Sequence, residues 1–185
     1  MLTDQQVRDA LKEAIELNTR FLTTEEMLRA IMHQAIVEPM SRAAAELPSG
    51  TATEQLRNYA GRAWEIINTP VFAGIYRIVV AEVPEYPALA GFFSAEVSNP
   101  IQLQLERIIT RGIARGEFRP VTPAAAARVI TGSFLTQALW CNHPDVWGPS
   151  SGPGAHRVVP ETLGLMLEGL NRTSSHSLPP DGRMK

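Results

Sequence analysis

Apolar residues recur along most of this chain at the spacing of an α-helix. Between about residues 52 and 68 they follow i, i+3, i+4 spacing, which places them on one face of a helix. The same period predicts further helices at about 4–17, 24–46, 70–83, 88–115, 123–141 and 158–170. No segment shows sustained alternation of apolar and polar residues, the pattern of a half-buried strand. The sequence therefore predicts an all-α fold.

Capping boxes mark the starts of two of these helices. Thr51 and Glu54 stand three residues apart, so the hydroxyl and the carboxylate can satisfy free N–H groups of the first helical turn. Thr23 and Glu26 repeat this spacing ahead of another helix. Side-chain chemistry therefore supports both starts independently of the apolar period.

Two features predict departures from a regular, half-exposed helix. Pro39 lies inside the helix expected at 24–46 and predicts a kink or an early end, because proline has no N–H to donate. Pro100 interrupts the helix expected at 88–115 in the same way. The helix expected at 70–83 has apolar residues around almost its whole circumference, which predicts that it is buried at the centre of the fold.

Composition narrows the class of protein. The chain has 185 residues, of which 44% are hydrophobic and 19% charged, which suits a globular protein with one main domain. Cys141 is its one cysteine, so no disulfide can form within the chain. The first residues lack the basic start and apolar run of a signal peptide, and no stretch reaches the roughly 20 apolar residues of a membrane span. We therefore expect a cytoplasmic protein with no membrane partner.

The N-terminal part of the chain carries a net negative charge. Over residues 1–47, five basic residues minus eight acidic residues give −3. The basic residues are Arg8, Lys12, Arg20, Arg29 and Arg42, and the acidic residues are Asp4, Asp9, Glu13, Glu16, Glu25, Glu26, Glu38 and Glu46. Because phosphate contacts supply most of the non-specific affinity for DNA, this end is poorly equipped to bind it.

Three stretches of sequence are similar to parts of one protein family, in the order in which that family has them. Residues 21–31 read FLTTEEMLRAI, which resembles the junction between a DNA-reading helix and the first body helix. Residues 77–89 read RIVVAEVPEYPAL, similar to the middle of the body, and residues 113–120 read IARGEFRP, similar to the turn before the dimer-forming helix. The chain thus resembles the TetR (tetracycline-repressor) family of transcriptional regulators over roughly residues 20–171.

This resemblance implies a domain organisation. Residues 23–171 would form the ligand-binding and dimerisation domain, a TetR-like C-terminal helical bundle. Its two C-terminal helices would pair with those of a twin subunit as a four-helix bundle. Residues 1–22 would be a remnant or degenerate DNA-binding segment, and residues 172–185 a disordered tail.

The N-terminus departs from the family pattern. Members of the family place a three-helix DNA-binding domain before the junction, whereas only some twenty residues precede it here. The glycine and tyrosine expected in the helix-turn-helix are absent, and Thr24 replaces the lysine expected after the junction serine. A reading helix needs a supporting helix to hold it in the major groove. We therefore expect no autonomous, sequence-specific binding to DNA, although DNA is a partner that the resemblance implies.

The resemblance also implies an interior pocket for a small apolar or amphipathic ligand, enclosed by the helices between residues 24 and 115. The candidate lining residues are Met32, Trp64, Tyr76, Phe92 and Phe93. The alternative is that each is an ordinary core residue, because large apolar side chains are usually buried for packing. Trp64 and Tyr76 are the better candidates, because each has a polar tip that needs a partner when buried.

The last two long helices each carry an apolar face, and the resemblance implies that they form a homodimer interface. The candidate interface residues are Ala127, Ile130, Phe134, Ala138, Leu163, Met166, Leu167 and Leu170. Two long apolar helices at the end of a chain favour a two-fold interface in which both subunits use the same surface. The alternative is that these faces pack on each other within one subunit.

The sequence contains no signature of catalysis or of a cofactor. No nucleophile motif surrounds Ser94 or Ser133, and no glycine-rich phosphate loop occurs. The four histidines show no metal-ligand spacing, so we expect no metal site, no cofactor and no enzyme activity. The arginines at 107, 111 and 115 could hold an anion, or form a solvated face paired with acids such as Glu106.

The sequence therefore favours a ligand-sensing and dimerising body of a TetR-like transcriptional regulator. One alternative is a stand-alone small-molecule-binding helical protein with no role at DNA. A small helical enzyme acting on an apolar substrate is another, and it would need a perturbed ionisable group in the pocket, such as Glu82.

Overall fold

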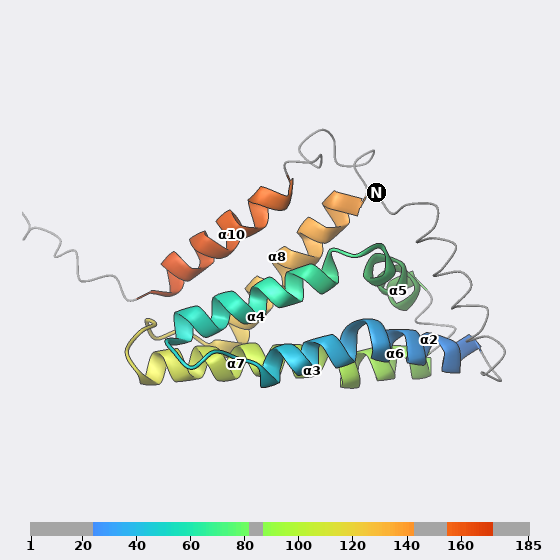
Figure 1. Cartoon of the computed structure of the whole chain (residues 1–185), viewed down its shortest axis with the longest axis horizontal. Helices are drawn as coiled ribbons and strands as arrows, with labels where there is room; N and C mark the ends of the chain where they lie inside the picture. The colour runs from blue at the N-terminus through green and yellow to red at the C-terminus, as the bar shows by residue number, and fades with distance from the viewer. Residues whose placement is uncertain (1–23, 82–86, 143–154, 172–185) are drawn as a thin grey trace, which may run out of the picture.

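The computed structural model describes residues 24–81, 87–142 and 155–171, and these ranges are almost entirely helical (Figure 1). The elements are α2 (Thr24–Met32), η1 (His33–Val37), α3 (Glu38–Ala45), α4 (Ala52–Ile67), α5 (Pro70–Ala81), α6 (Pro87–Phe92), η2 (Phe93–Ser98), α7 (Asn99–Ala114), α8 (Pro123–Asn142) and α10 (Ala155–Leu170). Within the described ranges the β-structure is one isolated bridge between Phe118 and Asn171. The predicted all-α fold is confirmed. The segment 1–22, the helix expected at 4–17 and the tail at 172–185 lie outside the described residues.

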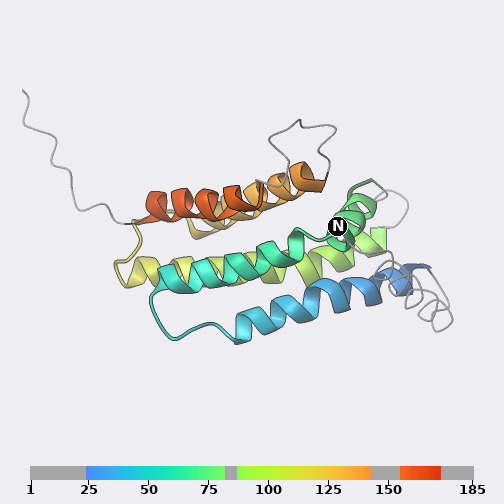
Figure 2. The same ribbon diagram turned by 45° about the horizontal axis from the view of Figure 1, so that its top comes forward.

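The helices stack in tiers with α4 at the centre (Figure 2). One tier holds the long element made of α2, η1 and α3, and the opposite tier holds α8 and α10. Helix α4 lies between them and contacts α3, α7, α8 and α10. Its buried side chains are Ala52, Gln55, Leu56, Tyr59, Ala60, Ala63 and Ile67. These positions match the predicted period, and each large apolar side chain among them contributes about 1.5–3 kcal/mol of burial free energy.

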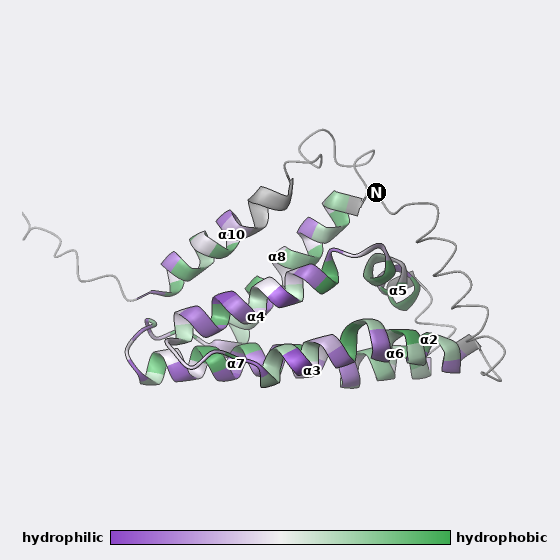
Figure 3. Cartoon of the chain, viewed as in Figure 1, coloured by the Kyte–Doolittle hydropathy of each residue, from purple (hydrophilic) through white to green (hydrophobic). Residues whose placement is uncertain are grey.

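Helix α5 is the exception to the expected burial pattern. Its turns are hydrophobic almost throughout (Figure 3), which predicted a central position. Instead α5 closes one end of the bundle, in contact with α4, η1 and α8. Phe72, Ile75 and Val79 are buried, whereas Val71 is 47% exposed. The prediction that this helix is central was wrong. Because α5 lies at the end of the bundle, the described helices cover only one of its sides.

Two π-helical segments replace the break that proline was expected to cause. In η1 the N–H of Glu38 reaches back five residues to the carbonyl of His33, one residue before Pro39. Segment η2 has the same five-residue bond at its end and stands just ahead of Pro100. A π turn widens the helix by one residue and shifts the hydrogen-bond register before the residue that lacks an N–H. The helical path therefore continues through both prolines.

The turn between α7 and α8 is fixed by close packing. Gly116 adopts a φ of 71°, a left-handed conformation that favours glycine, so the predicted helix stop is confirmed. The Phe118 ring is fully buried and lies directly against Gly112, whose carbonyl accepts hydrogen bonds from the N–H groups of Glu117 and Phe118 at 2.9 and 3.1 Å. A side chain at Gly112 would occupy the space that this ring fills.

The same turn is bonded to the ends of two other helices. The capping box of Thr51 and Glu54 is present at the start of α4, as predicted. A second carboxylate joins it there, because Glu117 Oε2 accepts from the N–H of Ala52 at 2.6 Å. At the end of α10, Arg119 Nε donates to the carbonyl of Gly169 at 2.6 Å. The turn thereby holds the ends of α4, α7 and α10 together.

Candidate functional site

The five predicted ligand-lining residues lie in the interior or at its edge, and they fall into separate groups. Met32 is fully buried in the core. Trp64 packs edge-on against Phe134 of α8, with ring centroids 5.9 Å apart. Met32 belongs to the core, and Trp64 is partly buried against it.

The structure does bring Tyr76 and Phe93 together, with ring centroids 6.4 Å apart. Tyr76 also stacks on Phe72, with centroids at 6.0 Å, so three aromatic rings gather where α5 meets η2. Phe92 belongs to a different contact, since the Arg29 guanidinium lies 5.2 Å from the centre of its ring. Of the five candidates, Tyr76 and Phe93 therefore share one aromatic cluster, and Phe92 faces an arginine.

Seven of the eight predicted interface residues lie inside the single chain. Ala127, Ile130, Phe134, Ala138, Leu163, Leu167 and Leu170 are all buried among the helices of one protomer. Only Met166 is partly exposed. These apolar faces of α8 and α10 pack on each other and on α4, the alternative that the sequence left open. Three of the eight, Ile130, Met166 and Leu170, also line a cavity that opens between these helices.

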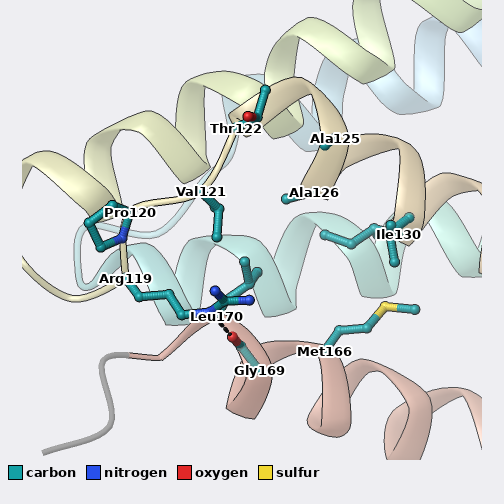
Figure 4. A pocket seen from close by; sticks show the side chains of 11 residues that line it. Arg119, Pro120, Val121, Thr122, Ala125, Ala126, Ile130, Met166, Gly169 and Leu170 are labelled. Atoms are coloured by element: carbon teal, nitrogen blue, oxygen red, sulfur yellow. Dashed lines mark hydrogen bonds between the residues drawn. The ribbon is translucent and has the colours of Figure 1, made fainter. Parts of the chain in front are cut away.

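The surface that α8 and α10 leave uncovered has its own apolar side chains. Val129 is 59% exposed and Leu165 is 71% exposed. A cavity of about 490 Å³ opens beside Val129, between the start of α8 and the end of α10. Figure 4 shows Val121, Ala126 and Met166 around this cavity, with Arg119 at its edge bonded to Gly169.

A second depression of about 430 Å³ continues along the outer side of α8. Its lining residues on α8 include the small side chains of Gly132, Ser133 and Thr136. Small residues on an exposed helix allow another helix to approach closely. The sequence held a signal for this surface, because Val129, Gly132, Ser133 and Thr136 follow i, i+3, i+4, i+7 spacing on α8.

The chemistry of the described residues is limited. Among them, no group of three or more histidine, cysteine, aspartate or glutamate side chains is placed to hold a metal ion. His33 Nδ1 lies 3.3 Å from Glu38 Oε1, a five-residue separation that the π turn brings onto one face. Burial raises the pKa of the Cys141 thiol, which lowers its thiolate fraction. No helix within the described ranges has the length and apolar character needed to cross a membrane.

Two solved structures are similar to this chain over most of its length. The solved structure of a TetR family transcriptional regulator, PfmR from Thermus thermophilus, matches with a TM-score of 0.62 and 22% identity, over 92% of this chain and 90% of that chain. A protein of unknown function from Rhodococcus sp. RHA1 matches with a TM-score of 0.59 and 19% identity, over 82% of this chain and 75% of that chain. No curated protein sequence matches the chain significantly. At these identities the two matches show a shared fold.

The family model described as the tetracyclin repressor-like C-terminal domain matches residues 46–146, more than half of the chain. The chain belongs to this family. It is therefore a TetR-like protein of the transcriptional-regulator class, and the family resemblance recognised in the sequence is confirmed.

Proposed function

We propose that this chain is the ligand-sensing and dimerising body of a cytoplasmic TetR-like transcriptional regulator, in which two copies pair through the outer faces of α8 and α10. The observation that carries the proposal is the exposure of Val129 and Leu165 on neighbouring helices. Family membership supports it, because TetR-like regulators are typically homodimers.

The surface around Val129 suits a second copy of the chain. Two cavities, of about 490 and 430 Å³, open on either side of this residue. The described residues leave the apolar surface in these cavities uncovered. Burying it against an identical face would contribute about 25 cal/mol per Å² of apolar area. Small residues such as Gly132 let two copies of α8 cross closely, and a two-fold axis would use the same residues on both subunits.

Ligand sensing would act by a population shift. A small apolar or amphipathic molecule bound in the body favours one orientation of the two subunits over another, by its difference in affinity for the two states. The aromatic cluster of Phe72, Tyr76 and Phe93 is the interior region that best supports such a role. It lies on α5 and η2, at the end of the bundle where the described helices cover α5 on one side only.

The first experiment on this proposal is the mass of the purified chain by light scattering at micromolar concentration. A mass of two chains is expected, and a monomer would remove the dimer part of the proposal. DNA from the protein's own gene neighbourhood is then tested by gel shift at low and moderate salt. We expect a folded dimer that does not bind it, and selective, salt-sensitive binding would make the chain a complete repressor instead.

A further inference from the structure

A long depression runs along the outer side of the molecule, between α3 and α7. It consists of two cavities, of about 260 and 780 Å³, which share Ala44, Leu103, Gln104 and Arg107 and are therefore continuous. We call this depression the α3–α7 groove. None of the residues at the α8–α10 surface or in the aromatic cluster lines it, so it is separate from both.

The floor of the groove holds two buried polar side chains, and one of them has an oxygen without a hydrogen-bond partner. Gln55 and Tyr59 stand four residues apart on α4, hence on one face of that helix, and are only 8% and 1% exposed. Gln55 Nε2 donates to the carbonyl of Pro48 at 3.0 Å, which fixes the orientation of the amide, yet Gln55 Oε1 accepts no hydrogen bond. Burial raises the pKa of the Tyr59 hydroxyl.

Gln55 Oε1 is thus a buried oxygen without a partner, whereas the Tyr59 hydroxyl is not one of the fully buried atoms that lack one. A buried polar group without a partner costs free energy, so native proteins rarely keep one without a reason. Tyr59 lines the narrow end of the groove and Gln55 the wide end. The two residues therefore lie along the length of the groove.

The narrow end of the groove is built by the two π-helical segments. Ile36 and Val37 of η1 and Glu96 and Val97 of η2 line it together. These segments contact each other, and π turns inside α-helices occur frequently at functional sites. Here both widened turns fall at the same cavity, and their aliphatic side chains give it apolar walls.

The rim of the groove offers two arginines with free hydrogen-bonding capacity. Arg107 and Arg111 lie one turn apart on α7 and line the groove, and neither forms an ion pair with a described residue. Glu106 lines the same stretch, yet it does not pair with them. The next arginine along this edge, Arg115, is already engaged, since it donates to the carbonyl of Gly50 at 3.1 Å. Two neighbouring guanidinium groups can share one carboxylate or phosphate oxygen pair.

We propose that the α3–α7 groove binds an amphipathic organic anion. Its carboxylate pairs with Arg107 and Arg111, its apolar body lies against the aliphatic walls of the narrow end, and a polar atom on that body bonds Tyr59. Glu96, at the narrow end, excludes a second negative charge there. This inference rests on the proposed function only for the ligand's role as an effector, because binding itself needs no dimer and no DNA.

Calorimetric titration of the full chain with octanoate, octanol and octylamine tests the charge preference. Octanoate should bind at one molecule per chain, at least about tenfold more tightly than octanol, because charge-assisted hydrogen bonds are among the stronger polar contacts. Octylamine should bind more weakly than both. If octanoate does not bind, or octylamine binds as tightly, the proposal is overturned.

The double variant Arg107→Gln, Arg111→Gln tests whether the two arginines at the rim bind the carboxylate. It should weaken octanoate binding by about tenfold or more and leave octanol unchanged. The matched control is Arg57→Gln, Arg62→Gln, which removes two arginines of α4 that lie outside the groove and should change neither titration. Equal loss in both double variants, or loss in neither, contradicts the assignment to the groove.

Tyr59→Phe gives a readout that does not depend on the choice of probe. Because Tyr59 lines the groove, a hydroxyl that faces the groove can be removed without loss of an internal hydrogen bond, and the Tm of the ligand-free protein should stay unchanged or rise. A clear fall in Tm would mean that the hydroxyl is already satisfied inside the protein, and would remove it from the recognition surface. A dimer that fails to bind octanoate overturns this inference alone, and a monomer that binds octanoate overturns the proposed dimer alone.

Discussion

The turn between α7 and α8, called the corner below, differs in kind from the outer face of α8 and α10. At the corner, backbone groups at the ends of three helices have partners from within the chain, including Glu117 on Ala52 and Arg119 on Gly169. On the outer face, Val129 and Leu165 are more than half exposed, and cavities open beside Val129. One region is complete in a single chain, and the other leaves apolar area uncovered.

This difference separates the part of the molecule that holds the fold from the surface that we propose binds a second subunit. The corner depends on fitted contacts, so small changes there should cost stability without affecting assembly. The outer face makes few contacts of its own, so changes there should affect assembly and leave the fold intact. Substitutions at the corner and substitutions on the outer face each test this contrast.

Gly112→Ala should have the largest effect. An added Cβ would strike the buried Phe118 ring and come within 2.9 Å of the Ala52 Cβ, and neither neighbour has free space to move into. Overpacking of this kind should lower the free energy of unfolding by about 3 kcal/mol, measured by urea denaturation.

Gly61→Ala is the matched control for that substitution. Gly61 is also inside a helix, but a Cβ there would meet nothing within 4 Å. Alanine should raise stability by about 0.5–1 kcal/mol, because glycine is a poor helix residue. If the two variants have equal stability, the close packing assigned to the corner is contradicted.

Val129→Glu combined with Leu165→Glu should separate the subunits. Two carboxylates on the outer face would be buried and repelled across a two-fold interface, which should weaken dimerisation by about 2 kcal/mol or more, some thirtyfold in Kd. Sedimentation equilibrium measures the change, and the free energy of unfolding of the monomer should hardly move. Val71→Glu, a similar substitution at an exposed valine of α5, serves as the control and should leave the dimer intact. An unchanged Kd in the double variant would place the interface elsewhere.

The sequence was a good guide to the fold wherever local chemistry decides the structure. The capping box of Thr51 and Glu54 and the helix stop at Gly116 depend on a few neighbouring residues, and both are present. The π turns before Pro39 and Pro100 were not predicted, because a proline is compatible with a kink, an end or a widened turn. Packing against the facing helix decides among these outcomes, and this packing cannot be read from a single sequence.

The sequence was a weaker guide to the site, for a related reason. Helix α8 has apolar residues on more than one side, so periodicity could not tell the face that packs inside, with Phe134, from the face that carries Val129. Tyr59 gave no sign of function, because its position fits the core period of α4. The groove that it lines is formed only when α3 and α7 are placed over it.

Glu54→Gln should have the smallest effect of the set, and one that depends on pH. Bonds from the backbone N–H of Thr51, and then from its hydroxyl, lower the pKa of the Glu54 carboxyl below its ordinary value of 4.5. A carboxyl with a depressed folded-state pKa adds stability above its unfolded-state pKa and loses it as the pH falls through the folded-state pKa. Wild type should therefore be slightly more stable than the variant near neutral pH, and the two should converge in a window below pH 4.5. Thermal melts of both proteins across that range measure the difference, which should be much smaller than that for Gly112→Ala because Glu54 is fully exposed. A difference that persisted at the acid end would show that the charge of Glu54 is not what stabilises the start of α4.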